Sequence, residues 1–141
     1  MTIYTDYLND LVNGKATLPL MAEKMELGGI KNWREGYAEK EIMISKSWFS
    51  GESLFGGYIA SLADQTMFFA SASKLDNNEI LSTAELNVKY YKPIKEGLLT
   101  IKATVIYDSG SKQEVEAEMY CGTTLMAKAF AKQSITCKKP S

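Results

Sequence analysis

The stretch of residues 59–73, IASLADQTMFFASAS, is apolar on every face and carries a single charge, the carboxylate of Asp64. Its length, its content of Ala, Leu and Met, and the absence of Gly and Pro predict a helix. A helix without a polar face is buried on all sides. In a chain of 141 residues a sheet can cover only one of those sides, so the pattern also predicts a second copy of the chain against the other side.

The half of the chain after this helix alternates between apolar and polar residues, which is typical of an antiparallel sheet with one buried face. The alternation is strict in residues 114–121, where Val115, Ala117 and Met119 face one side and glutamates face the other. Turn residues separate the predicted strands, which span residues 81–91, 98–107, 114–121 and 125–136.

The half before the helix predicts a short amphipathic helix and then a hairpin. Apolar residues at a 3–4 spacing indicate the helix over residues 4–12, and Asn13-Gly14 ends it. The hairpin would join residues 25–33 and 37–45 around Arg34-Glu35-Gly36. The sequence therefore predicts one α+β domain over residues 1–141, with a helical part at 1–15, the central helix at 56–75 and a strand-rich half at 81–136.

The chain has no histidine, and this restricts its chemistry. Ser-His-Asp triads, Cys-His dyads and His-dependent metal sites are all excluded. Cys121 and Cys137 lack a metal-binding spacing, so we expect no metal and no cofactor. Catalysis would have to come from a carboxylate, another polar side chain or backbone dipoles.

Charge and hydropathy set further limits on partners and location. The net charge is −1 and the lysines are balanced by acids, so nucleic acid is not an expected partner. No apolar run is long enough to span a membrane, and the first residues do not resemble a signal peptide, so we expect a cytoplasmic protein without a membrane partner.

Two features of the helix region carry the candidate chemistry. Asp64 has apolar residues one turn away, and such a carboxylate is poorly solvated unless it lies at a cleft or is hydrogen-bonded. Gly56-Gly57 comes just before the apolar run, where backbone N–H groups at a helix N-terminus can stabilise a developing oxyanion. The alternatives are an acid held in a structural network and a simple tight turn.

Three segments in the right order resemble the PaaI-like hotdog thioesterases of the phenylacetate-pathway type. The segment FGGYIASLADQTMFFA resembles their glycine-pair and helix-acid motif, and TAELNVKYYKP with IKEGLLTIKATVIYDS resembles their central strand pair. The segment LMAKAFAKQSIT resembles their last strand. The resemblance covers residues 37–136 and implies a hotdog fold, in which a curved antiparallel sheet wraps one long helix in homodimers or dimers of dimers.

The resemblance also implies an acyl-CoA thioesterase whose active site lies between two subunits. By position, Asp64 matches the acid that activates water or attacks the thioester carbonyl. Gly56 matches the glycine whose N–H polarises that carbonyl, and Thr83 matches a position where members use Ser or Thr to hold water. Gly57 accompanies this group as a substrate-binding residue.

Further substrate contacts are hypotheses from side-chain character. An apolar acyl pocket would be lined by Phe49, Phe55, Tyr58 and Phe68. Contacts with the phosphates of coenzyme A are expected from Lys89, Lys92 and Lys95, although charged residues at strand ends are usually only solvated.

The chain departs from the family pattern at two positions. Phe55 stands where the family has a His before the glycines, and Phe49 or a neighbour stands where it has a polar residue. These changes are compatible with a shifted site that uses Ser50, Glu52 or Ser53.

They are equally compatible with acyl or acyl-CoA binding without turnover, which is the alternative function. A hotdog dehydratase or isomerase is disfavoured because those enzymes rely on His. An unrelated cone-shaped α+β domain fits the order of elements poorly.

Overall fold

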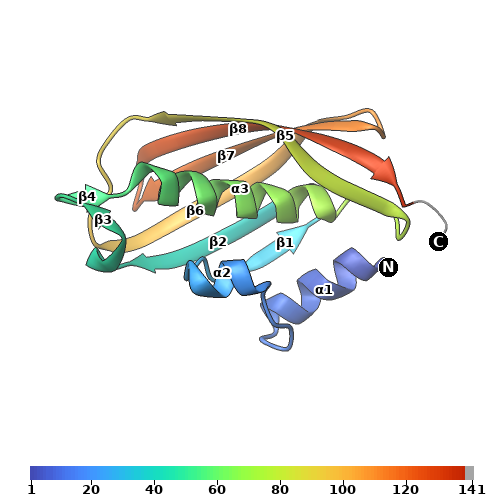
Figure 1. The fold of residues 1–141 in the computed structure, drawn as a ribbon, viewed down its shortest axis with the longest axis horizontal. Helices are drawn as coiled ribbons and strands as arrows, with labels where there is room; N and C mark the ends of the chain where they lie inside the picture. Colours follow the sequence, from blue (N-terminus) through green and yellow to red (C-terminus); the bar gives the residue numbers. More distant parts are fainter. Residues whose placement is uncertain (139–141) are drawn as a thin grey trace.

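The computed structural model describes residues 1–138 and has the predicted hotdog architecture. One long helix, α3 (Gly56–Ala72), lies against a curved antiparallel sheet (Figure 1). The main strands are β2 (Tyr37–Ile44), β5 (Glu79–Tyr90), β6 (Gly97–Asp108), β7 (Lys112–Cys121) and β8 (Thr124–Cys137). The shorter elements are α1 (Ile3–Val12), α2 (Leu20–Lys24), β1 (Asn32–Arg34), the 3-10 turn η1 (Lys46–Trp48), β3 (Phe49–Ser50) and β4 (Ser53–Leu54).

The six-stranded sheet has the order β1-β2-β6-β7-β8-β5, and every neighbouring pair is antiparallel. The alternation predicted for β7 is confirmed, because Val115, Ala117 and Met119 are fully buried. Within residues 1–138, strand β5 pairs only with β8, so its other edge is free. A free edge presents unpaired N–H and C=O groups, which makes it a template for a further strand.

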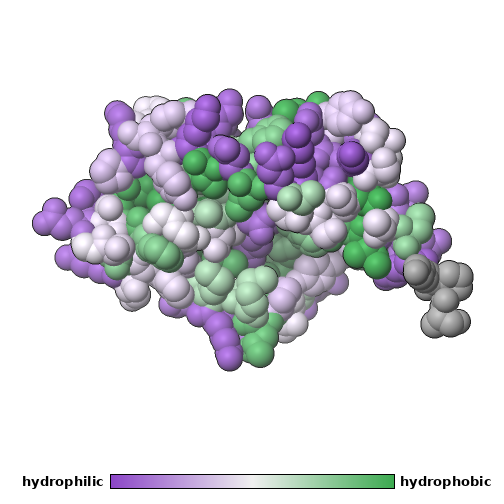
Figure 2. Space-filling view, turned by 45° about the horizontal axis from the view of Figure 1, so that its top comes forward, coloured by the Kyte–Doolittle hydropathy of each residue, from purple (hydrophilic) through white to green (hydrophobic). Residues whose placement is uncertain are grey.

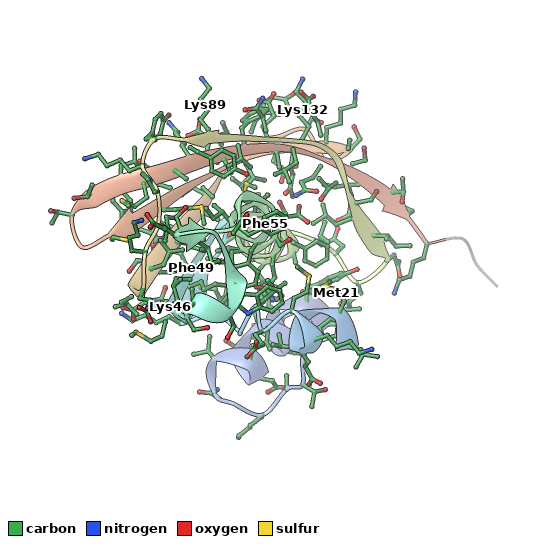
Figure 3. The ribbon with its side chains drawn as sticks, turned by 60° about the vertical axis from the view of Figure 1, so that its left-hand side comes forward. Met21, Lys46, Phe49, Phe55, Lys89 and Lys132 are labelled. Atoms are coloured by element: carbon green, nitrogen blue, oxygen red, sulfur yellow. The ribbon has the colours of Figure 1, made fainter. Side chains whose placement is uncertain are left out.

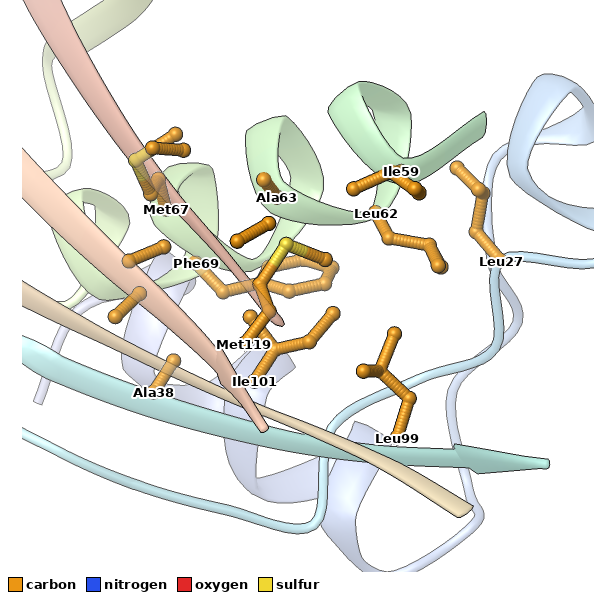
Figure 4. Packing of buried hydrophobic residues seen from close by; sticks show 14 of the residues in the cluster. Leu27, Ala38, Ile59, Leu62, Ala63, Met67, Phe69, Leu99, Ile101 and Met119 are labelled. Atoms are coloured by element: carbon orange, nitrogen blue, oxygen red, sulfur yellow. The ribbon is translucent and has the colours of Figure 1, made fainter. Parts of the chain in front are cut away.

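The core lies between α3 and the inner face of the sheet. Leu62, Ala63 and Met67 of the helix pack over strand residues such as Ile101 and Met119, and all five are completely buried (Figure 4). Fully burying a side chain of this size contributes roughly 1.5–3 kcal/mol relative to exposure. The apolar faces predicted from sequence therefore account for the packing of helix on sheet.

The two ends of α3 are fixed in different ways. Gly56 and Gly57, which precede the apolar run, form the first turn of α3, and the N-cap residue Phe55 offers no side-chain hydrogen bond to it. At the other end, the Gly36 N–H donates to Ser73 Oγ over 2.7 Å. Gly36 has φ +77°, a left-handed conformation that suits glycine, so the β1–β2 turn can approach the helix end closely.

The N-terminal residues form a second helical layer on α3 (Figure 1). Helix α1 buries Leu8 and Leu11, as its amphipathic pattern predicts, and Trp33 Nε1 donates to Asn9 Oδ1 over 2.9 Å. Helix α2 was not predicted from the sequence, because five residues are too few to establish a helical period. The β3–β4 hairpin was likewise expected only as a loop.

Candidate active site

Asp64 and Thr83 form a hydrogen-bonded pair between α3 and β5. Thr83 Oγ1 donates to Asp64 Oδ1 over 3.1 Å, and Asp64 is half-buried. The pairing of β5 with β8 shifts register between Thr83 and Glu85, which marks a β-bulge beside the pair. Bulges re-aim side chains and often lie next to active sites. The structure thus brings together two of the three residues expected to be catalytic.

Asp64 lies on the wall of an apolar cavity of about 540 Å³ between α3 and the N-terminal helices. This volume is within the range typical of small-molecule sites. Its polar side groups from α3 are those of Ser61, Asp64 and Gln65. The other lining residues are Ile3, Tyr4, Tyr7, Pro19, Met21, Ala22, Met25, Leu27, Phe68 and Phe69. A carboxylate at the edge of an apolar cavity suits a reaction on an apolar substrate.

Of the four aromatic residues expected in an acyl pocket, only Phe68 lines this cavity. Tyr58 is a core residue: its ring stacks on Trp48 at 4.5 Å, and its hydroxyl donates to the Glu26 carbonyl over 2.7 Å. Burial raises the pKa of Tyr58 to about 12, so it stays a neutral donor. Sequence reasoning missed the residues from α1 and α2 because nothing in their pattern says that they fold over α3.

Phe49 and Phe55 lie at the start of α3 and away from the cavity (Figure 3). Phe49 pairs with Leu54 in the β3–β4 hairpin. The exposed Phe55 ring lies over Gly57, where an added Cβ would approach the ring to 2.7 Å. Gly57 therefore accommodates the Phe55 ring.

Gly56 offers backbone groups at the N-terminus of α3. Within residues 1–138 its N–H has no hydrogen-bond acceptor, while its carbonyl accepts from the Tyr90 hydroxyl over 2.8 Å. Gly56 borders a surface hollow of about 300 Å³ together with Ser53, Tyr90 and Lys92. The free N–H and the positive end of the helix dipole could stabilise an anionic oxygen in this hollow.

Gly56 and Asp64 of one chain cannot act on the same carbonyl group. They are eight residues apart on one helix, which corresponds to about 12 Å along its axis. A reacting carbonyl would have to lie about 3 Å from both groups. The third expected catalytic residue is therefore remote from the other two within a single chain.

The lysines expected to contact phosphates occupy different surroundings. Lys89 is exposed on β5 and points away from the molecule, on the opposite side from Met21 of α2 (Figure 3). Lys92 borders the hollow beside Gly56, and Lys95 Nζ donates to the Glu52 carbonyl over 2.8 Å. Of the three, Lys92 has the placement best suited to a ligand bound near Gly56.

Lys40 is fully buried beneath the loop that leads from α2 to β1, and sequence reasoning did not single it out. Its Nζ donates to the carbonyls of Leu27, at 2.7 Å, Gly28, at 3.0 Å, and Gly29. Gln65 Nε2 also donates to the Gly28 carbonyl over 3.0 Å. Since Leu27 and Gln65 line the cavity, Lys40 fixes part of the cavity wall.

Burial of Lys40 predicts a stability that rises with pH. Desolvation lowers the pKa of Lys40 to about 7 from 10.5, so between these values the unfolded chain binds more protons than the folded chain. The cost of burying the charge is complete below pH 7 and is relieved as the pH rises. Relative to Lys40→Met, the wild-type free energy of unfolding should increase by on the order of 2 kcal/mol from pH 7 to pH 9.

Urea denaturation at several pH values measures this difference. Lys102→Met, which removes an exposed lysine from β6, is the control and should leave the wild-type pH slope unchanged. Equal pH slopes for wild type and Lys40→Met would contradict a lowered pKa of Lys40.

The described residues also bear on the requirements of a metal site and of a membrane-spanning helix. In residues 1–138, no three His, Cys, Asp or Glu side chains are grouped so that they could hold a metal ion. Over the same residues, no helix has both the length and the apolar character needed to cross a bilayer.

A curved antiparallel sheet around one long helix, with an acid on that helix beside an apolar cavity, defines a hotdog-fold protein of the thioesterase type. The family model described as Thioesterase superfamily matches residues 51–127, more than half of the chain. The chain belongs to this superfamily. No curated protein matches the sequence significantly.

Solved structures support the fold. The E. coli PaaI protein from the phenylacetic acid degradation operon has a TM-score of 0.81 at 17% identity, over 98% of this chain and 99% of that one. A phenylacetic acid degradation-related protein from Ralstonia eutropha JMP134 has a TM-score of 0.81 at 21% identity, over 91% and 98%. The smu.793 protein from Streptococcus mutans UA159, bound to acetyl CoA, has a TM-score of 0.69 at 23% identity, over 79% and 90%.

The resemblance to PaaI-like hotdog proteins is therefore confirmed.

Proposed function

We propose that the protein hydrolyses acyl-CoA thioesters at sites formed by two copies of the chain. The observation that carries this proposal is the Asp64–Thr83 pair at the edge of a large apolar cavity, within a chain of the thioesterase superfamily. The cavity would receive the acyl group, and the reacting carbonyl would lie beside Asp64. The acetyl CoA bound to the Streptococcus mutans neighbour supports a CoA thioester as the substrate class.

The residues present are sufficient for thioester hydrolysis. Asp64 would accept a proton from a water molecule as its oxygen bonds to the carbonyl carbon, and Thr83 would hold the carboxylate and the water. The negative charge that develops on the carbonyl oxygen would be stabilised by the Gly56 N–H of the other copy. The C–S bond then breaks and the thiolate leaves. Direct attack by Asp64 on the carbonyl is the other route open to the same residues.

A second copy is supported by geometry. The separation of about 12 Å between Gly56 and Asp64 leaves each chain with an incomplete site. The free edge of β5 offers a place for antiparallel pairing with its own copy. Apolar side chains lie between hydrophilic ones on the face that carries β5 (Figure 2), and Leu86, Tyr90 and Tyr91 are exposed there.

The cavity predicts a preference for longer acyl groups. Burial of each additional methylene contributes about 0.8 kcal/mol, so kcat/KM should rise by up to about four-fold per methylene from acetyl-CoA until the cavity is full. Met21→Lys places a charge on the cavity wall and should remove this preference, while activity on acetyl-CoA changes little. Release of free thiol from a series of saturated acyl-CoAs measures both effects.

Met43→Lys is the matched control, because Met43 is an exposed methionine on β2 that does not line the cavity. It should keep the wild-type chain-length profile. An identical loss of preference in both variants, or a flat profile in the wild type, would contradict an acyl group in this cavity.

Acyl-CoA binding without turnover is the second candidate function. It is favoured by Phe55 and Phe49, which replace polar residues of the PaaI-like pattern at the start of α3. The same series separates the two functions: saturable binding with no thiol release from any member would establish the binding protein and reject the hydrolase.

A further inference from the structure

A row of polar side chains is buried in the core near the C-terminal end of α3. Ser71 of α3, Gln113 of β7 and Gln133 of β8 are all at most 1% exposed. Gln113 and Gln133 are directly opposite each other in the β7–β8 ladder, and Gln113 Nε2 donates to the Ser71 carbonyl at the long distance of 3.5 Å. The proposed mechanism uses none of these three residues.

Most of the polar atoms in this row lack partners. In the described part of the chain, no hydrogen bond reaches Ser71 Oγ, Gln113 Oε1, or either side-chain polar atom of Gln133. Buried polar groups nearly always have a protein or water partner, because leaving them unpaired loses the hydrogen bonds they made in solvent. Four such atoms in one cluster point to a bound molecule that can both donate and accept. Water has this chemistry, and buried waters typically bridge such groups.

The row leads to the Asp64–Thr83 pair. Gln133 is directly opposite Thr83 in the β5–β8 ladder, so the two side chains are neighbours on the inner face of the sheet. Thr83 in turn donates to Asp64. Asp64 and Ser71 are seven residues apart, about two turns of α3, and so lie on the same side of the helix. The buried polar residues therefore lie beside the Asp64–Thr83 pair in the sheet, and Ser71 lies two turns from Asp64 on the same helix.

The chemistry of the threonine hydroxyl gives this row a function. A hydroxyl has one O–H to donate and lone pairs that accept. If the lone pairs of Thr83 Oγ1 accept hydrogen bonds from the Gln133 amide or its water, the single O–H of Thr83 is held in the hydrogen bond to Asp64. We propose that buried water between Ser71, Gln113 and Gln133 completes a hydrogen-bonded row that ends at Thr83, and that Gln133 is thereby a positioning residue for the Thr83–Asp64 pair. The positioning role rests on the proposed hydrolase function, whereas the water site does not.

The variant Gln133→Leu tests the positioning role. Leucine has a similar size but removes the amide that the proposed water would bond, so the melting temperature should fall by no more than a few degrees. The value of kcat should nevertheless fall by about ten-fold or more, with KM within about two-fold of wild type, because the carboxylate is less well oriented. Ile135→Ala is the control: it weakens the core two residues further along β8 and should lower the melting temperature with kcat retained.

A high-resolution crystal structure of the wild type tests the water site independently. Ordered water bonded to Gln133 and to Ser71 or Gln113 supports the proposal. A dry cluster in which the two glutamines bond directly to each other overturns it. An unchanged kcat in Gln133→Leu, in an enzyme that Asp64→Asn inactivates, overturns the positioning role alone. Absence of thiol release by the wild type would reject the hydrolase and leave the water site to the crystal structure.

Discussion

Replacement of Asp64 by asparagine should lower kcat for acyl-CoA hydrolysis by roughly 10³-fold, the loss expected when a general base is removed. Asparagine keeps the size of the side chain and can still accept the hydrogen bond from Thr83, so the helix and the cavity should be retained. Thiol release measures the activity, and thermal unfolding should give a melting temperature within a few degrees of wild type.

Asp76→Asn is the control for this variant. Asp76 lies in the exposed turn after α3, and its substitution removes the same charge without touching the cavity. It should hydrolyse acyl-CoA at the wild-type rate. Wild-type activity in Asp64→Asn would remove the acid from the mechanism and with it the main reason for placing the reaction in the cavity.

Replacement of Gly56 by proline should lower kcat by roughly 10²–10³-fold, which is the usual effect of removing one oxyanion donor. Proline deletes the N–H that the mechanism uses and is well tolerated at the first position of a helix. The preceding residue, Phe55, already has φ −60° and ψ 130°, an extended conformation that is compatible with a following proline. The fold should therefore survive the substitution.

Gly56→Ala is the matched control, because it adds a Cβ and keeps the N–H. The added atom would meet the Tyr90 hydroxyl at 3.5 Å, an ordinary van der Waals contact. Alanine should thus retain most of the activity that proline loses. Equal loss in the two variants would attribute the effect to crowding of the hollow, and no loss in either would assign the oxyanion to another donor.

The sequence was sufficient to predict the fold and to single out Asp64, because both depend on local patterns. Strict alternation in residues 114–121 identifies a half-buried strand without knowledge of its neighbours. Asp64 is equally easy to single out, because a lone charge in an apolar helix needs a specific environment. Thr83 was named through the family resemblance as a residue that holds water, and its hydrogen bond to Asp64, with Oγ1 and Oδ1 3.1 Å apart, became visible only in the structure.

The cavity could not be predicted from the sequence, because it forms where segments that are distant along the chain pack together. Residues of α1 and α2 lie on α3. The pattern of residues 3–24 does not indicate which element these helices pack against. The aromatic residues nearest to Gly56-Gly57 were expected to line the acyl pocket. In the structure Tyr58 packs in the core and Phe49 belongs to the β3–β4 hairpin.

Two inward-facing polar residues did leave a signal in the sequence. Gln133 follows Ala129 and Ala131 at the same alternation, and Lys40 follows Ala38 in β2. A polar residue on the buried face of a strand requires a hydrogen-bond partner. Lys40 finds its partners in the carbonyls of the loop before β1, and for Gln133 we propose buried water. The helix motif indicates neither of them.

Activity of mixed dimers tests most directly whether each site uses Asp64 of one chain and Gly56 of the other. Inactive Asp64→Asn and Gly56→Pro proteins would be mixed, and subunit exchange verified with differently labelled chains. In a shared-site dimer, each heterodimer contains one site with both groups intact. After complete random exchange, we expect recovery of about one quarter of the wild-type activity, because half of the dimers are mixed and half of their sites are whole. No recovery despite verified exchange would contradict it.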